Sequence, residues 1–557
     1  MKKTIWLIFL SLCSGGLFSQ AAFTENQKLE SLCKVWGFLK YYHPVVGEGK
    51  TDWDQQLIQF IPAVISAKDK QELSNLYLRW IGSLGSVKRC KKCRKTVIPD
   101  SLKRNQDLRW MEDHSFFSDS LIGVFDFVRE NRSRHINYNS KQDYFHFPVA
   151  FEKNQPYPGM VYPGMEYRLL SLFRFWNVIN YYFPYKYAIG EDWNLVLSEM
   201  LDKFKEPKDT VDYHLALAEL TAKINDSHSG LTTKYVFRHF GSYRVPFKIR
   251  IIDEKAVVTA FFNDTLSNAD DMRYGDAILS VNNKPVSEIL SERDKYICAS
   301  NSSCKLYRQS WYLLNGKTDT ARITYDRDGK KYQKCIHRYL FKDLNVRAKT
   351  YSEISSKDTN EMTGIMEGHI GYINMGKLPR NRVRQVMKQM MTTNAIIFDL
   401  RNYPDGTAWK IAKYLSGKRQ PFARYSSPLK GNPGIFEEVM NYGGTKNAHP
   451  YKGKVVILVD ERTISQAEYS CMMIQGVIPA TIVGSQTAGA DGDIATFTFP
   501  GGYQTWFSGH GIYYPDGRET QRIGIVPDIE VTQTLDGIRK GKDEILDRAI
   551  KFISTGQ

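Results

Sequence analysis

The spacing of apolar residues changes twice along the chain and separates three regions. Up to about residue 240, apolar and aromatic side chains recur at helical spacing, which predicts paired helices. From about residue 241, short stretches such as Val245–Ile252 alternate between apolar and polar residues, as strands do. After residue 346, apolar runs such as Asn394–Leu400 and Lys454–Asp460 alternate with amphipathic stretches, which predicts an α/β core with parallel strands.

The helical region contains an internal duplication at an offset of 140 residues. The matching residues are Leu29, Leu32, Trp36, Tyr41, Tyr42, Pro44, Asp52, Trp53 and Leu57, which recur as Leu169, Leu172, Trp176, Tyr181, Tyr182, Pro184, Asp192, Trp193 and Leu197. In both copies a proline ends the first apolar segment and an Asp-Trp pair begins the next, as at a helix N-cap. We therefore expect two helical hairpins with aromatic cores.

The two copies differ at the end of the repeat. The second copy runs into Asn225–Gly230, which includes Ser227 and His228, whereas the first copy has Lys88 opposite the histidine. A repeat that kept only its packing would not need a histidine flanked by hydroxyl groups. The segment is therefore either a site of chemistry or a polar helix end, and its pattern alone does not separate the two.

The β region includes a turn and strand pattern that resembles a PDZ domain. The segment Arg273–Val286 has a Gly-Asp turn, an apolar strand and an Asn-Asn-Lys-Pro turn. A PDZ domain binds an extended peptide as an added strand, often through the peptide's terminal carboxylate. A purely structural β domain is the alternative. Residues 98–163, between the two repeats, show no clear period, and we assign them no fold.

Composition and charge exclude several classes of protein. With 42% hydrophobic and 24% charged residues, the chain is not disordered, collagen-like or a multi-span membrane protein. The net charge of +16 favours anionic partners, but its basic residues are scattered except in Lys88–Lys95, where six of eight residues are Lys or Arg. No nucleic-acid module surrounds this run, so we interpret it as a solvated loop and expect no nucleic-acid partner.

The N-terminus predicts export. Lys2 and Lys3 precede the apolar stretch Ile5–Leu12, and small residues near Ser19–Ala21 offer a cleavage site, which is the pattern of a secretory signal over residues 1–21. A lipid anchor on Cys13 is less favoured, because such motifs need a small residue where Leu12 stands. We expect a periplasmic, cell-surface or extracellular protein with no stable membrane span.

Seven cysteines remain after the predicted cleavage, so at least one is unpaired in a monomer. The pairs Cys90/Cys93 and Cys298/Cys304 are each close enough in sequence for a local disulfide in an oxidising compartment. A zinc site is less favoured, because neither pair has a second pair of ligands nearby. We therefore expect no metal.

Two loops at the carboxyl ends of predicted strands contain candidate chemistry, since sites collect at that edge of an α/β sheet. Gly406 lies in the first loop, and its backbone N–H can approach a substrate oxygen closely. Ser465 lies at the start of a predicted helix in the second loop. An attack by its hydroxyl would place the oxyanion near the N–H groups of Gly406 and Gln466. The alternative is that Ser465 is only an ordinary helix-start residue.

Three motifs together resemble the C-terminal-processing and tricorn family of serine peptidases. They are Asp399–Gly406, Thr463–Glu468 and Gly524–Asp528. Together with the PDZ-like segment and the upstream Asp-Ser-His at 226–228, they make a resemblance that covers about residues 165–545. The duplicated helical start resembles that of tricorn-type secreted members from Bacteroidetes-like bacteria. The family implies a ClpP/crotonase-like catalytic core that hydrolyses peptide bonds through an acyl-enzyme, without a cofactor, and it makes Ser465 the nucleophile.

The general base distinguishes the branches of this family. The processing branch uses a lysine 25 residues after the serine, but this chain has Ala490 there and no lysine between Lys454 and Lys540. The tricorn-like branch uses a histidine preceded by a serine before the PDZ module, which implies His228 and Ser227 here. A neutral imidazole suits this role at neutral pH.

A fourth residue of the tricorn-type site departs from the family pattern. The family has a glutamate three residues before the glycine of Gly-x-x-Pro-Asp, and the matching residue here is Gln521, which carries no charge. Glu519 is a candidate substitute, and His510 is a competing base. Losing a charged orienting group lowers the rate of a serine hydrolase without abolishing it.

The sequence thus predicts a multidomain exported serine peptidase whose substrate is a peptide or protein. Ser465 is the predicted nucleophile and His228 the base, with Ser227 and Gln521 orienting His228. The predicted units are a signal at 1–21, a degenerate helical repeat at 22–160, a second repeat at 161–240, a PDZ-like domain at 241–345 and the α/β core at 346–557. The alternatives are a catalytically impaired peptide- or glycan-binding protein that retains the fold, and an esterase using the same serine.

Overall fold

The computed structural model covers the three regions that the sequence pattern separates. It describes residues 23–557 except 91–92, 94–97, 133–136, 138–139, 141–148, 150, 152–154, 232, 263 and 345–362. The predicted signal and Cys13 lie outside the described residues. In the described part of the chain, no helix is both long enough and apolar enough to cross a membrane.

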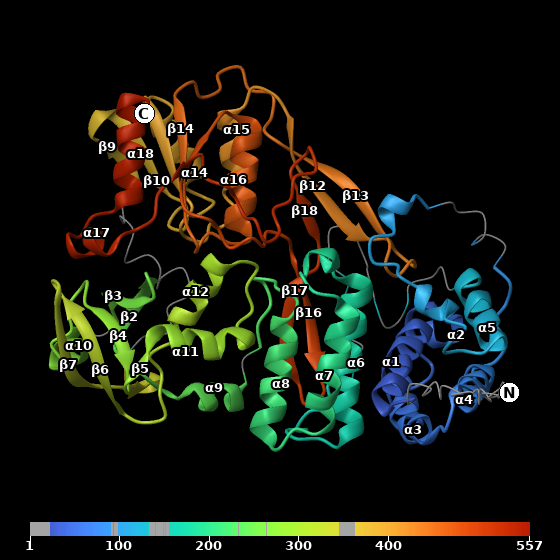
Figure 1. Cartoon of the computed structure of the whole chain (residues 1–557). Coiled ribbons are helices and arrows are strands. Elements are labelled where there is room, and N and C mark those ends of the chain that lie inside the picture. The colour runs from blue at the N-terminus through green and yellow to red at the C-terminus, as the bar shows by residue number, and fades with distance from the viewer. Residues whose placement is uncertain are drawn as a thin grey trace, which may run out of the picture.

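The helical region consists of two matching sets of helices (Figure 1). The first set is α1 Glu25–Tyr42, α2 Pro44–Gly47, α3 Trp53–Ser66, α4 Lys70–Ser83 and α5 Asp119–Glu130. The second set is α6 Met165–Tyr182, α7 Trp193–Lys205, α8 Thr210–Ala222 and α9 Lys234–Phe240. The α3 and α7 helices both begin after an aspartate N-cap, Asp52 and Asp192. The expected duplication of helical hairpins is therefore confirmed.

A reciprocal pair of tryptophans joins the two helices of each hairpin. The indole of Trp36 donates to the carbonyl of Trp53 at 2.9 Å, and that of Trp53 donates to the carbonyl of Trp36 at 3.1 Å. Trp176 and Trp193 repeat the exchange at 2.7 and 3.0 Å. Each buried indole N–H needs an acceptor, and the carbonyl of the partner tryptophan supplies it. The recurring tryptophans therefore fix the same crossing of two helices in both repeats.

The described part of the region from residue 243 to 340 contains an antiparallel main sheet, a separate two-stranded sheet of β1 and β8, and three short α-helices. Its strands are β1 Tyr243–Arg244, β2 Phe247–Ile252, β3 Lys255–Phe261, β4 Ala277–Val281, β5 Lys284–Pro285, β6 Thr320–Arg327, β7 Lys330–His337 and β8 Tyr339–Leu340. Its helices are α10 Asp264–Ala269, α11 Val286–Arg293 and α12 Ser302–Ser310. The main sheet has the order β2-β3-β4-β6-β7, so β2 is an edge strand.

The C-terminal region contains the expected α/β sheet. The strand order is β19-β15-β14-β11-β10-β9, and all neighbours are parallel except β9 and β10. The strands are β9 Gly364–Met366, β10 Ile370–Asn374, β11 Ala395–Asp399, β14 Lys454–Val459, β15 Thr481–Gly484 and β19 Ile529–Glu530. The helices are α14 Val383–Met390, α15 Ala408–Leu415, α16 Gln466–Val477, α17 Leu535–Arg539 and α18 Glu544–Thr555.

Helices cover both faces of this sheet, which explains why its strands are apolar throughout. Ile396 and Phe398 of β11 pack with α14, α15 and α16 on one face. Ala395 and Ile397, which point to the other face, pack with α18. The carboxyl ends of β10, β11 and β14 therefore lie side by side at one edge of a sheet that is buried on both faces.

Two β-hairpins extend from the core to the helical region (Figure 1). The strands β12 Gln420–Pro428 and β13 Phe436–Gly443 pair with β18 Gly511–Tyr513 and reach the first helical repeat. The strands β16 Ile494–Phe499 and β17 Tyr503–Ser508 form a separate ribbon. Phe175 of α6 contacts Phe497 and Phe499 of this ribbon, each with ring centroids 5.4 Å apart. The ribbon thus belongs to the aromatic core of the helical region.

Two of the cysteine expectations have different outcomes. Of the two pairs that are close enough in sequence for a disulfide, Cys90 and Cys93 form one. Cys298 and Cys304 do not, and both are buried, free thiols. Cys298 lies instead against the hydroxyl of Thr221, at 3.7 Å. In the basic run, Lys88 and Arg89 are exposed, as in a solvated loop, and its other four cations lie outside the described residues.

A buried ion pair between the two helical repeats offers a test of their association. Arg174 of the second repeat donates to both carboxylate oxygens of Asp54 of the first. Burial alone would raise the pKa of Asp54, but Arg174 and Lys40 hold it below its ordinary value. We expect Arg174→Met to lower the free energy of unfolding by about 3–5 kcal/mol, because it leaves a buried carboxylate without its partner.

The measurement is urea unfolding followed by tryptophan fluorescence. The control is Lys540→Met, which removes the solvent-exposed pair between Lys540 and Asp536 and should cost less than ~1 kcal/mol. Equal effects of the two substitutions would contradict a dominant role for the buried pair.

Candidate active site

Ser465 lies at the carboxyl end of β14, on a tight turn that begins α16. Its backbone has φ 57° and ψ −121°, in a region that residues with a side chain rarely adopt. Its N–H donates to the carbonyl of Ala490 at 2.8 Å. Ser465 is half-buried, and strain of this kind in a serine at a helix start is characteristic of a functional position rather than of an ordinary cap.

Glu468, one turn into α16, joins the serine turn to the loop 487–490. Its carboxylate accepts hydrogen bonds from the N–H groups of Gly489 at 2.7 Å and Ala490 at 2.9 Å, and from that of Ser465 at 3.3 Å. The hydroxyl of Thr487 also donates to it. Burial raises the pKa of Glu468 to about 7, although these donors favour its charged form. The carboxyl group therefore fixes the backbone around the serine.

Two backbone N–H groups, one in the loop after β11 and one in the serine turn, are free to bind an anion. Gly406 has φ 56°, in the left-handed region that favours glycine, and Gln466 is the first residue of α16. Within the described part of the chain, neither N–H has a protein acceptor. The hydroxyl of Thr463 bonds to the carbonyl of Leu400 at 2.9 Å and so holds the two loops together. This arrangement suits an oxyanion hole.

His228 is held by a serine and an aspartate in a defined tautomer. Its Nδ1 lies 2.9 Å from the hydroxyl oxygen of Ser508, and this hydroxyl lies 3.1 Å from Oδ1 of Asp226. A carboxylate can only accept, so the Ser508 hydroxyl donates to Asp226 and its oxygen accepts the Nδ1 proton of His228. The proton-free nitrogen is then Nε2, which is buried and has no partner among the described residues. This is the tautomer that a general base requires.

The same contacts set the protonation of the ring. Burial lowers the pKa of His228 below its ordinary value, the charge of Asp226 raises it, and Arg308 lowers it again. Asp226 is itself fully buried and also accepts the N–H groups of His228 at 3.0 Å and Ser508 at 2.6 Å. The imidazole is therefore neutral at neutral pH, with a negative charge one hydroxyl away to stabilise an imidazolium.

Ser227 and Gln521 do not contact the imidazole ring, in contrast to the expectation that they orient it directly. The hydroxyl of Ser227 donates to the carbonyl of Ala488 at 2.7 Å and accepts the N–H of Ser300 at 2.8 Å. The side-chain amide of Gln521 lies 3.5 Å from Oδ1 of Asp226. Ser227 thus anchors the backbone of the histidine loop, and Gln521 acts on Asp226 rather than on the ring.

The alternative residues are occupied elsewhere. Glu519, the candidate substitute for the missing glutamate, accepts the hydroxyl of Tyr187 at 2.8 and 2.9 Å. Nδ1 of His510 lies 3.3 Å from Oδ2 of Asp493, and its ring packs against Tyr425 with centroids 5.6 Å apart. The structure records no contact of either residue with His228 in the described chain.

The loop 487–490 connects the histidine segment with the serine turn. Ser227 binds the carbonyl of Ala488, and Ser465 binds the carbonyl of Ala490 two residues later. Ala490 is fully buried, so its small side chain fits where the processing branch would need a lysine. The turn of the predicted nucleophile and the segment of the predicted base are therefore both hydrogen-bonded to the same short loop.

Sequence reasoning gave no role to Asp226 or Ser508. Asp226 precedes Ser227 in the quoted motif, so a carboxylate two residues before the histidine was an available signal. Ser508 had no such signal, because its position depends on the docking of the β16–β17 ribbon against the helical region. No group of three or more His, Cys, Asp and Glu side chains in the described chain is placed to hold a metal ion.

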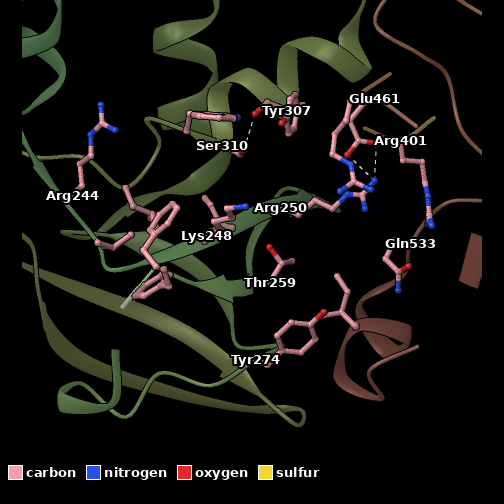
Figure 2. Close-up of a pocket in the computed structure, with 18 of the residues that line it drawn as sticks. Arg244, Lys248, Arg250, Thr259, Tyr274, Tyr307, Ser310, Arg401, Glu461 and Gln533 are labelled. Carbon is pink, nitrogen blue, oxygen red and sulfur yellow. Dashed lines mark hydrogen bonds and ion pairs between the residues drawn. The ribbon is translucent and has the colours of Figure 1, made fainter. Parts of the chain in front are cut away.

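A cavity of about 250 Å³ lies between the antiparallel module and the catalytic core. Figure 2 shows Arg244 at one end of it and Arg401 with Glu461 at the other. Its lining includes the edge strand β2 and the helix α12. An ion pair of 2.6 Å between Arg250 and Glu461 joins the two domains beside the cavity.

Comparison with known proteins gives a family match over part of the chain and a similar fold. The model of peptidase family S41 matches residues 369–531. A Chlamydia trachomatis serovar D protein is 30% identical over 153 residues, which cover 26% of this chain and 25% of that protein. The chain thus matches about a quarter of the length of this curated relative.

Solved structures with a similar fold include those of mature CPAF and of mature CPAF complexed with lactacystin. Each has a TM-score of 0.56 and 14% identity, and the match covers 71% of this chain and 99% of CPAF. At this identity, the likeness concerns the fold alone.

The assigned tautomer of His228 gives a direct prediction. In NMR spectra of selectively ¹⁵N-labelled histidine, His228 should be protonated at Nδ1 and should titrate below its ordinary pKa of about 6.5. Asp226→Asn should move the titration to still lower pH, since it removes the charge that raises the pKa. Ser508→Ala should abolish the preference for the Nδ1 tautomer.

The loss of one resonance in His228→Gln assigns the signal, and His510→Gln serves as the matched control. A ring protonated at Nε2 in the wild type would contradict the assignment.

Proposed function

We propose that the chain is a serine-type hydrolase of peptidase family S41, whose model matches residues 369–531, and that it hydrolyses peptide bonds through an acyl-enzyme on Ser465. The observation that carries this proposal is the relay from His228 through Ser508 to Asp226, which leaves Nε2 as a base. In the proposed reaction, Nε2 takes the proton of Ser465 as its hydroxyl attacks the substrate carbonyl. The same nitrogen then gives the proton to the leaving amine.

The N–H groups of Gly406 and Gln466 stabilise the oxyanion in this mechanism. Each donor in such a site is worth roughly a hundredfold or more in rate, because it is already oriented when charge develops. Asp226 stabilises the imidazolium through the Ser508 hydroxyl. This arrangement supplies the negative charge that Gln521 lacks, and it favours an active peptidase over the impaired binding protein. The assignment to the tricorn-like branch rests on the same use of a histidine.

We expect Ser465→Ala to abolish both peptide hydrolysis and labelling by a fluorophosphonate probe, because the probe reacts only with an activated serine. His228→Gln should lower the rate of labelling by at least ~100-fold. The matched control is Ser470→Ala, one turn further along α16, where the hydroxyl only bonds to the carbonyl of Gln466. An unreactive wild-type Ser465 combined with tight peptide binding would favour the non-catalytic alternative, and turnover of esters but not peptides would favour the esterase.

We further propose that the antiparallel module is a PDZ-like domain that captures the end of a peptide substrate along β2. Support comes from Arg244, the last residue of β1, which precedes β2 by three residues and lines the same cavity. Its guanidinium lies 5.0 Å from the ring centroid of Phe237 and 5.1 Å from that of Phe341. Its Nε is buried without a partner in the described chain, and burial lowers the pKa of the group. A half-buried cation without a carboxylate partner suits a terminal carboxylate.

Arg244→Gln should raise KM for peptides with a free C-terminal carboxylate by roughly tenfold. A hydrogen bond to a charged group contributes about 1.4 kcal/mol, which corresponds to this factor. The same peptides with an amidated C-terminus provide the control and should bind wild type and variant alike. An equal effect on both sets of peptides would contradict carboxylate capture.

We also propose that the protein is exported to an oxidising compartment. The disulfide between Cys90 and Cys93 supports this, because disulfides persist in such compartments.

A further inference from the structure

Arg380 lies directly against the loop that contains Gly406. It follows β10 and precedes α14, and its Nε donates to the carbonyl oxygen of Asp405 at 2.7 Å. Its Nη2 lies 2.5 Å from the position that a Cβ atom on Gly406 would occupy. The carbonyl of Arg380 accepts a hydrogen bond of 3.1 Å from Lys410 on α15. The guanidinium therefore covers one side of the peptide unit that joins Asp405 to Gly406.

This contact acts on the proposed oxyanion hole through a single amide group. The carbonyl of Asp405 and the N–H of Gly406 are the two ends of one planar peptide unit. A cationic donor at the carbonyl oxygen fixes the orientation of that plane, and it polarises the amide so that its N–H becomes a stronger donor. In the described chain this N–H has no protein acceptor, so it is available to the substrate.

We propose that Arg380 is a positioning residue for the oxyanion hole, acting on the reaction through the peptide unit between Asp405 and Gly406. The proposal rests on the proposed function and extends it to a residue that does not touch the substrate. Arg380 should stabilise the transition state, in which the oxyanion forms, and so raise kcat. It should affect substrate binding little, because the carbonyl of the bound substrate carries little charge.

The ion pair with the Asp405 side chain is a secondary contact. The carboxylate Oδ1 lies 3.5 Å from Nε, and the side chains of Arg380 and Asp405 are 62% and 63% exposed. Exposed pairs of this kind contribute little to stability. The same exposure means that replacing Arg380 leaves the fold intact, so a kinetic effect of the substitution can be interpreted.

The backbone conformation explains the residue at position 406. Its φ of 56° lies in the left-handed region that favours glycine, whereas the neighbouring Arg380 guanidinium is the end of a flexible, exposed side chain. The same turn brings the carbonyl of Asp405 against the arginine.

The test compares Arg380→Met with wild type in steady-state peptide hydrolysis. We expect kcat to fall by about 10- to 100-fold, less than the loss of a whole oxyanion donor, with KM changed by less than ~2-fold. The matched control is Arg384→Met, an exposed arginine on α14, which should leave both parameters unchanged. Guanidinium ion added to Arg380→Ala should restore part of kcat, whereas sodium at equal ionic strength should not.

Inhibitors give a second measurement that a merely structural role would not affect. A peptide aldehyde forms a tetrahedral adduct with the serine and places an oxyanion in the hole, whereas the matching peptide alcohol forms no adduct. Arg380→Met should raise the inhibition constant of the aldehyde by the same factor by which it lowers kcat. The inhibition constant of the alcohol should stay unchanged. A raised KM with unchanged kcat would overturn the proposal and indicate that Arg380 binds a substrate carboxylate instead.

Failure of this proposal is distinguishable from failure of the proposed function. Fluorophosphonate labelling of wild-type Ser465 tests the nucleophile without reference to Arg380. If Ser465 is labelled and peptides are cleaved while Arg380→Met has normal kcat, only the positioning role is wrong. If wild-type Ser465 is neither labelled nor needed for cleavage, the proposed function itself is wrong.

Discussion

The docking of the β16–β17 ribbon into the aromatic core of the helical region is the interaction on which the candidate site depends. Phe497, Phe499 and Phe507 of the ribbon are fully buried with the helical repeat, although they belong in sequence to the catalytic half. Ser508 ends this ribbon and binds both His228 and Asp226. The aromatic packing therefore places the Ser508 hydroxyl between the imidazole of His228 and the carboxylate of Asp226.

Apolar packing of this kind is strong but has no direction, so polar contacts must set the geometry. Three short segments provide them: the histidine loop, the loop 487–490 and the turn at Ser465. Ser227 and Glu468 bind the loop 487–490 from its two sides, through Ala488 and through Gly489 and Ala490. Because these groups are buried, an unmade hydrogen bond would be costly, and the segments have one favourable arrangement. The site is thus ordered before any substrate binds.

The departure at Gln521 has a physical compensation in this arrangement. A glutamine cannot stabilise an imidazolium by charge, but Asp226 carries a negative charge one hydroxyl away from the ring. Gln521 lies next to Asp226 and completes the set of donors around it. In this chain the negative charge next to the candidate base therefore comes from the helical repeat, on the same loop as His228.

Several features of the fold followed from local rules and were predictable. The strands around residues 247–252, 395–399 and 454–459 follow from two-residue alternation or from continuous apolar runs. The duplicated hairpins follow from repeated aromatic residues at helical spacing, and the structure adds their reciprocal indole bonds. The possible disulfide between Cys298 and Cys304 does not form, because closeness in sequence does not bring two thiols together when one of them packs against Thr221.

The sequence by itself determined the candidates for nucleophile, base and oxyanion glycine, because their short motifs resemble those of a peptidase family, whereas their local spacing alone also fits ordinary turns and helix ends. Only the tertiary structure decided which groups orient the base, because Asp226 and Ser508 are distant in sequence and meet through packing between domains. The same holds for Arg380 and Gly406, which lie in loops after neighbouring parallel strands. Contacts of this kind depend on which strands are adjacent in the sheet, and no local pattern of residues encodes that adjacency.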